Sequence, residues 1–227
     1  MTIDVRPISI GALAAHPLRG ERGDCRPGHL TTSLITSGER CILVDPSLPP
    51  RVLSERLDER AGIKPAQVTH VFLSSFRPIG RRGLLLFEEA DWLVAEGERE
   101  AIGLALIQEF ERAQEAQDES LCETLRQEIA LLQRCQAAPD SLAEHVDLFP
   151  LPGVTAGFSG LLIADSKWTT LIASDAVPTI EHLEAGQVLA NIYDVEAAQE
   201  SMREVVEIAD LVIPGRDCLL PNPLRRW

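Results

Sequence analysis

The stretch THVFLSSFRPIGRRG, residues 69–83, decides how this sequence folds. It begins inside VTHVFLSS (68–75), a short and largely apolar run that is typical of a β-strand buried on both faces. The loop SFRPIGRRG follows directly and has the spacing of a metal-binding loop. The loop nevertheless contains almost none of the imidazole and carboxylate groups that a zinc or iron ion requires as ligands.

Further strands and helices alternate on both sides of this stretch. Apolar and β-branched runs predict strands at 31–46 (two strands around the turn SGER), 90–96, 145–151, 157–165, 168–175 and 210–215. Apolar residues at helical spacing predict helices over 51–62 and about 195–208. Interleaved strands and helices indicate a layered α/β domain.

A long helical stretch covers about residues 98–137, and AQDES (116–120) interrupts it, so we expect a helical hairpin. Its second half carries one apolar stripe with charged residues opposite, formed by Leu121, Leu125, Ile129 and Leu132. The stripe packs against the core, forms a homodimer interface or caps a pocket. The sequence does not separate these three alternatives.

Charge and cysteine content restrict the classes of partner and the compartment. The chain of 227 residues has 35 acidic and 21 basic residues, a formal net charge of −14. This charge repels phosphate backbones and anionic lipids, so we expect no nucleic acid and no membrane as partner. The N-terminus lacks the basic and apolar regions of a signal peptide, and five cysteines without C-x-x-C spacing suit reduced thiols. We therefore expect a soluble cytoplasmic protein.

Four segments together resemble the metallo-β-lactamase-fold hydrolases, in the order of that family's motifs. They are CILVDPSLP (41–49), VFLSSFRPIGRRG (71–83), LPGVTAGFSGLLI (151–163), and the pair LIASDA (171–176) and LVIPGRD (211–217). Asp45 matches the family's structural aspartate. The resemblance implies a single αββα sandwich domain over residues 1–227, with the helical hairpin at about 98–137 as an insertion.

The resemblance also implies where metal ligands would stand, and most of them are replaced. In the first loop the ligand positions hold Ser75, Arg77, Ile79 and Gly80; the later ones hold Val154, Asp175 and Arg216. One carboxylate cannot hold a divalent cation tightly, and two guanidiniums oppose its binding. We therefore expect no metal, no cofactor and no catalytic residue of the family's kind at this site.

A buried carboxylate needs a partner, so Arg77 and Arg216 are expected to pair with Asp175. The pair either props the loops in place or leaves positive charge for a small anionic ligand, with Arg81 and Arg82 beside it. His29 could face the same pocket from the preceding loop. The expected ligand-binding residues are Ser75, Arg77, Asp175, Arg216, Arg81 and His29.

Two functions are compatible with these residues. The first is a pseudoenzyme: a non-catalytic binding or structural protein with an arginine-lined pocket for a small anion. The alternative is a hydrolase of the metallo-β-lactamase superfamily, metal-dependent or metal-free, acting on an ester, thioester or phosphoester. A metal-free reaction would need a positioned base for a nucleophile such as Ser74, Ser75 or Cys218.

Overall fold

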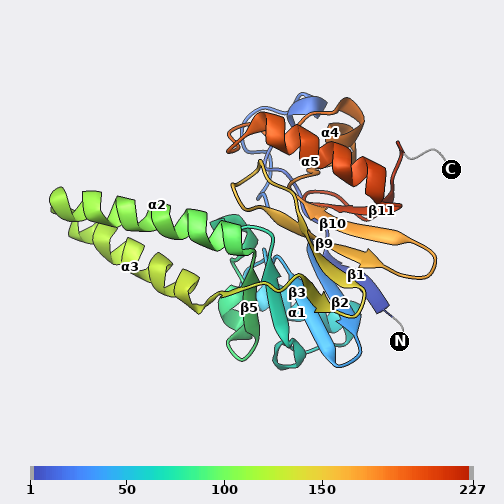
Figure 1. The fold of residues 1–227 in the computed structure, drawn as a ribbon, viewed down its shortest axis with the longest axis horizontal. Helices are drawn as coiled ribbons and strands as arrows, with labels where there is room; N and C mark the ends of the chain where they lie inside the picture. Colours follow the sequence, from blue (N-terminus) through green and yellow to red (C-terminus); the bar gives the residue numbers. More distant parts are fainter. Residues whose placement is uncertain (1–2, 225–227) are drawn as a thin grey trace.

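The computed structural model describes residues 3–224, which form two six-stranded β-sheets with helices on their outer faces (Figure 1). The first sheet has the order β1-β2-β3-β4-β5-β6, with bounds Ile3–Ser9, Thr32–Ser37, Arg40–Val44, His70–Leu73, Asp91–Val94 and Gln136–Ala137. The second has the order β12-β11-β10-β9-β8-β7. From β7 to β12 its strands are Ser141–Ala143, Val146–Pro150, Ser159–Ala164, Thr169–Ser174, Leu211–Pro214 and Leu220–Pro221.

The sheets face each other across an apolar core. Side chains of alternate strand residues fill it, among them Ile35, Ile42, Phe72, Leu161 and Ile172. On β4 the neighbours of Phe72 point to the opposite face, because side chains alternate along a strand. This two-sided burial explains why the run in β4 is apolar throughout.

Helices cover the two outer faces. Helix α1 (Pro50–Ala61) buries Leu53 and Leu57 against the face of the first sheet that carries Val71 and Leu73. Helix α5 (Val195–Ile208) packs against the second sheet beside the short helix α4 (Ile180–Ala185). The order helix, sheet, sheet, helix is the predicted αββα sandwich, and the fold class is confirmed.

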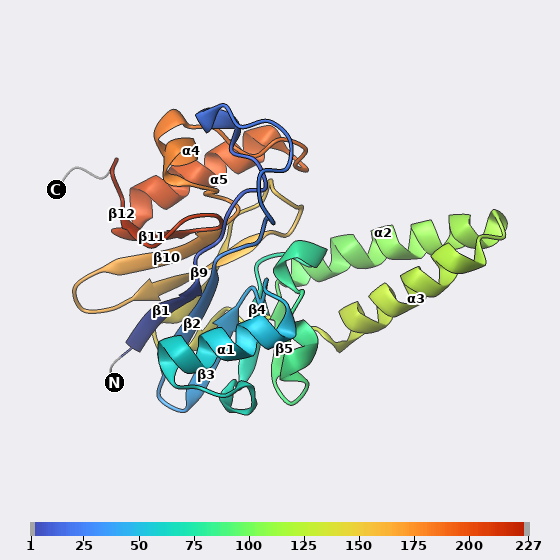
Figure 2. The same cartoon turned by 180° about the vertical axis from the view of Figure 1, so that it is seen from behind.

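Helices α2 (Glu96–Glu115) and α3 (Glu119–Arg134) form the predicted hairpin, which projects from one side of the sandwich (Figures 1 and 2). Asp118 caps α3 by accepting a hydrogen bond from the backbone N–H of Leu121 at 2.9 Å. The hairpin ends earlier than predicted, because residues 136–137 leave the helix and pair with β5 as strand β6. It also starts two residues earlier, at Glu96.

Parallel pairing brings the functional loops to one edge of the sandwich. Strands β3, β4 and β5 pair in parallel, as do β10 and β11, and parallel neighbours need crossover connections. The carboxyl ends of these strands therefore lie together in each sheet. In residues 3–224 no helix is long and apolar enough to cross a membrane, and the five cysteines, which all lie in this range, are free thiols.

Candidate functional site

Asp45 organises the edge of the sandwich where β3, β4 and β10 end. Its side chain is fully buried; Oδ1 accepts the backbone N–H of Ser74 at 2.9 Å, and Oδ2 accepts the hydroxyls of Ser74 and Ser174 at 2.8 Å each. Burial raises the pKa of Asp45 to about 6, although these hydrogen bonds act in the opposite direction. The aspartate thus ties together the ends of three strands from both sheets.

Asp175 follows β10, and both of its carboxylate oxygens are bound by arginine. Its side chain is 0% exposed. Arg216 donates from Nε to Oδ1 at 2.7 Å and from Nη2 to Oδ2 at 2.8 Å, which is a bidentate pair. Arg77 donates from Nη2 to Oδ2 at 2.5 Å. Burial would raise the pKa of Asp175, but the hydrogen bonds and charges of Arg216 and Arg77 outweigh it and hold the pKa below its ordinary value.

The loop after β11 brings Arg216 to this position. Its backbone N–H donates to the carbonyl of Pro178 at 2.8 Å. The preceding residue must be glycine, because a Cβ on Gly215 would lie 2.5 Å from Oδ1 of Asp175. The side chain of Arg216 is only 7% exposed, so its guanidinium is held inside the protein.

Arg77 is the solvent-facing member of the cluster. Its side chain is 28% exposed, and its Nε donates to Oγ of the buried Ser75 at 3.2 Å. Within residues 3–224, Nη1 of Arg77 has no hydrogen-bond partner. The predicted pairing of Arg77 and Arg216 with Asp175 is thus observed. Two guanidiniums meet one carboxylate, so the cluster has a formal charge of +1.

Arg81 was expected to face this cluster, but its guanidinium points toward α3 instead. Its Nε donates to the carbonyl of Phe76 at 2.9 Å, its guanidinium stacks on the Phe76 ring, and Nη2 pairs with Glu128 of α3. Glu128 therefore offsets the charge that we expected to attract an anion. Arg82 is exposed and donates to the carbonyl of Gly28 at 2.9 Å.

Within residues 3–224, no hydrogen bond joins the side chain of His29 to Asp175, Arg77 or Arg216. Its ring nitrogens are 3.5 Å from Oγ of Ser9 and 3.5 Å from the carbonyl oxygen of Pro27. Its backbone bridges to Ala12, which holds the residue on the N-terminal segment. Because the carbonyls of His29 and Gly215 both lie against Gly11, His29 is close to the loop of Arg216, and its place in the pocket stays a prediction.

The sequence did not predict a role for Glu98, whose carboxylate accepts hydrogen bonds from two loops of the site. Glu98 lies in the first turn of α2 and is fully buried. Its Oε1 accepts the backbone N–H of Phe76 at 3.0 Å, and its Oε2 accepts that of Gly157 at 3.2 Å. A Cβ on Gly157 would lie 1.9 Å from the nitrogen of Glu98, so only glycine permits this approach.

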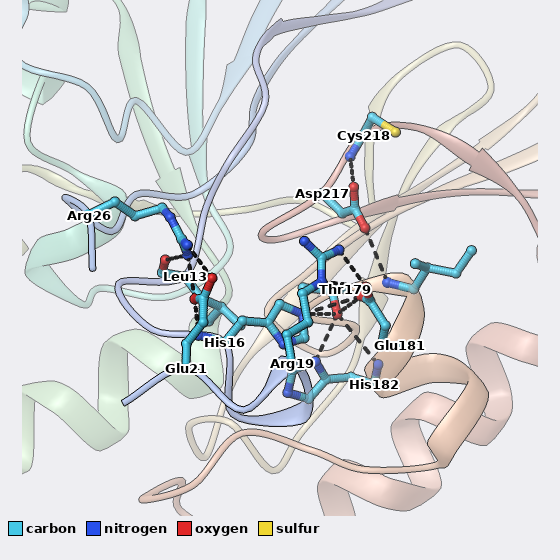
Figure 3. A network of polar contacts seen from close by, with 11 residues as sticks. Leu13, His16, Arg19, Glu21, Arg26, Thr179, Glu181, His182, Asp217 and Cys218 are labelled. Carbon is cyan, nitrogen blue, oxygen red and sulfur yellow. Dashed lines mark hydrogen bonds and ion pairs between the residues drawn. The ribbon is translucent and has the colours of Figure 1, made fainter. Parts of the chain in front are cut away.

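A second polar network, also not anticipated, lies beside the loop that carries Arg216 (Figure 3). Thr179 is its centre, with its Oγ1 at 2.8 Å from Oε2 of Glu181, 2.9 Å from Nδ1 of His182 and 3.2 Å from Nε2 of His16. Partial burial would raise the pKa of Glu181, but hydrogen bonds, foremost from Arg19, lower it to about 2. Through His16 and Arg19, the network holds the segment of residues 16–19 against the start of α4.

This network reaches the site through Asp217. The carboxylate of Asp217 accepts the backbone N–H of Ile180 at 3.3 Å and that of Cys218 at 2.8 Å (Figure 3). Asp217 follows Arg216 directly in the chain. Helix α4 therefore supports the loop that presents Arg216 to Asp175.

Comparisons with solved structures agree with this architecture. A protein from Thermotoga maritima assigned to the metallo-β-lactamases superposes with a TM-score of 0.69 at 17% identity, covering 97% of this chain and 100% of the other. The chain has the metallo-β-lactamase fold. The dizinc quorum-quenching lactonase AidC has a TM-score of 0.65 at 19% identity, covering 86% of this chain and 73% of AidC. The hydrolase AbOPH of the β-lactamase superfamily has a TM-score of 0.63 at 15% identity, covering 87% and 80%.

Comparisons at the level of sequence found no match, neither to a protein-family model nor to a curated protein. The identities to the solved structures are below 20%, so the likeness shows the metallo-β-lactamase fold and not a shared activity. These three neighbouring structures are described as a lactonase, a metallo-β-lactamase and a hydrolase.

The residues at this edge do not fit the metal that the metallo-β-lactamase fold implies. The oxygens of Asp175 already accept three hydrogen bonds from guanidiniums, which would stand beside an incoming cation. Within residues 3–224, no group of three or more His, Cys, Asp or Glu side chains could hold a metal ion. The chemistry of this site follows from its arginines.

Proposed function

We propose that this chain is a non-catalytic binding protein built on the metallo-β-lactamase fold, and that its site binds a small anion. The carrying observation is the formal charge of +1 on the cluster of Arg77, Arg216 and Asp175. Arg216 is enclosed, whereas Arg77 is 28% exposed and has donor capacity left on Nη1. A carboxylate or phosphate oxygen suits such a guanidinium because charge-assisted hydrogen bonds are the strong ones.

Anion titration with three variants tests the proposal. Isothermal titration with inorganic phosphate and with acetate should show binding that Arg77→Gln weakens at least about tenfold, since the exposed donors are lost. Asp175→Asn should tighten binding, because the formal charge of the cluster rises from +1 to +2. Arg82→Gln removes an exposed arginine outside the cluster and serves as the matched control. Equal binding by Arg77→Gln and Arg82→Gln would refute the site.

Hydrolase activity is the second candidate, and the similarity to a lactonase and a hydrolase favours it. Against a metal-free reaction, Oγ of Ser75 is engaged by Arg77, and in the described chain no histidine contacts it. The assay is turnover of lactone, thioester and phosphoester substrates with added zinc or manganese. Turnover that Asp175→Asn abolishes would support the hydrolase and contradict the non-catalytic proposal.

A further inference from the structure

The projecting hairpin carries an open groove between its two helices. The groove has a volume of about 570 Å³. Its charged lining residues are Glu96, Arg99 and Glu100, and its apolar ones are Leu104 and Ile107 from α2 and Ile129 and Leu132 from α3. Leu104 is 63% exposed and Ile107 is 52% exposed, one helical turn apart. Two large aliphatic side chains are thus presented to solvent on one face of a helix, and no further element of residues 3–224 lies over it (Figure 1).

The shape of the groove suits a third helix. At 1.5 Å per residue, the lined part of α2 from Glu96 to Ile107 is about 17 Å long, enough for about three helical turns of a partner. Gly103 adds no side chain to the floor, and the atom nearest to a Cβ there would be Cδ2 of Leu132 at 3.8 Å. A helix can therefore approach closely and complete a three-helix arrangement.

The charge of the hairpin determines which kind of partner helix it attracts. Residues 96–134 contain ten acidic and four basic side chains, so the hairpin alone carries −6 of the net charge of −14. Three of its arginines are engaged within the protein (Arg112 with Glu109, Arg126 with Glu123, Arg134 with Glu88). The fourth, Arg99, lines the groove between Glu96 and Glu100, so the groove itself keeps a formal charge of −1 within the acidic hairpin. A second copy of this chain would bring a like charge of −6 against it, whereas a basic segment would be attracted.

The hairpin is also firmly attached, so the groove is preorganised. Glu98 at the start of α2 binds two backbone N–H groups of the sandwich, and Glu128 of α3 pairs with Arg81. The base of α3 packs Leu132 into the core of the first sheet. A surface held in place before binding loses little conformational freedom on association.

We infer that the α2–α3 groove is a docking surface for a cationic amphipathic helix of a partner protein. The apolar face of that helix would cover Leu104 and Ile107, and its lysines or arginines would face Glu96 and Glu100. This inference is independent of anion binding at Asp175.

The test is fluorescence anisotropy with the full chain and a labelled synthetic helical peptide of about 14 residues, with leucines on one face and lysines on the other. A scrambled peptide of the same composition keeps the charge and loses the apolar face. The protein variants are Leu104→Asp with Ile107→Asp, and Gly103→Leu, which fills the groove and raises helix propensity. Tyr193→Asp, at a 73% exposed aromatic outside the hairpin, is the control.

We expect the amphipathic peptide to bind at least about tenfold more tightly than the scrambled one. Both groove variants should weaken binding by a similar factor, although the aspartates add negative charge, and Tyr193→Asp should not. Equal binding of the two peptides, or unchanged or tighter binding by the aspartate variant, would overturn the inference. So would light scattering that shows a dimer which the aspartate variant converts to monomer, because a second copy would then fill the groove.

Discussion

Replacing Arg216 by glutamine removes the bidentate partner of a carboxylate that has no access to solvent. Asp175 is 0% exposed and Arg216 is 7% exposed, so solvent screening does little to weaken their interaction. Breaking a buried pair usually costs about 3–5 kcal/mol, and the remaining hydrogen bond from Arg77 reduces this to about 2–3 kcal/mol. For a chain of this size the melting temperature should fall by about 4–12 °C.

The pH dependence of this loss makes the prediction specific. In the wild type the pKa of Asp175 is lowered, so its stabilising contribution is present above about pH 4 and is lost as the pH falls through the folded-state pKa. Without Arg216, burial should raise that pKa instead. The difference in unfolding free energy between the wild type and Arg216→Gln should therefore shrink as the pH falls from 7 to about 4.

Urea unfolding at pH 7 and near pH 4 measures both quantities, with Arg82→Gln as the matched control. Arg82 is an exposed arginine whose loss should change the unfolding free energy by less than about 0.5 kcal/mol. A loss for Arg216→Gln as small as that of Arg82→Gln at pH 7 would refute the reasoning. So would a difference that does not change with pH.

Substitutions at Asp45, Gly215 and Glu98 test other contacts of the site. The pKa of Asp45 is raised to about 6, so its contribution to stability is complete below its unfolded pKa and is lost as the pH rises through 6. Urea unfolding of the wild type should therefore show a decrease of about 2 kcal/mol between pH 4 and 7, which Asp45→Asn should remove. Gly215→Ala should lower the unfolding free energy by about 1–3 kcal/mol, because the new methyl group would overlap Oδ1 of Asp175, and calorimetry would measure this. In Glu98→Gln an amide NH₂ replaces one carboxylate oxygen, so one buried N–H, such as that of Gly157, loses its acceptor. The unfolding free energy should fall by about 1–3 kcal/mol, and an unchanged melting temperature would contradict the role of Glu98.

Local signals predicted a layered α/β domain, whereas the αββα sandwich followed from the resemblance to the metallo-β-lactamase-fold hydrolases. The alternating environments of Val71, Phe72 and Leu73 require apolar residues on both faces of β4, and the helical spacing of α5 predicts its range closely. Helix α4 has only six residues, too few for a periodic pattern to mark it. Strand β1 contains Pro7, which interrupts an otherwise alternating run.

The arginine pair could be predicted because the resemblance places Arg77, Asp175 and Arg216 at ligand positions that converge in the metallo-β-lactamase fold. The direction of Arg81 could not, since its partner Glu128 lies 47 residues away on a hairpin whose orientation no local pattern encodes. Glu98 looks like an ordinary acidic residue in the first turn of a helix. Its burial depends on the approach of Gly157, which only the tertiary structure reveals.

The most direct test of the central proposal, that guanidiniums replace a cation at Asp175, is metal analysis of the protein after incubation with zinc and removal of free ions. The wild type and Asp175→Asn are measured side by side by elemental mass spectrometry. We predict the same low metal content in both proteins, because Arg77 and Arg216 occupy the carboxylate. A stoichiometric amount of zinc in the wild type that is lost in Asp175→Asn would contradict the proposal.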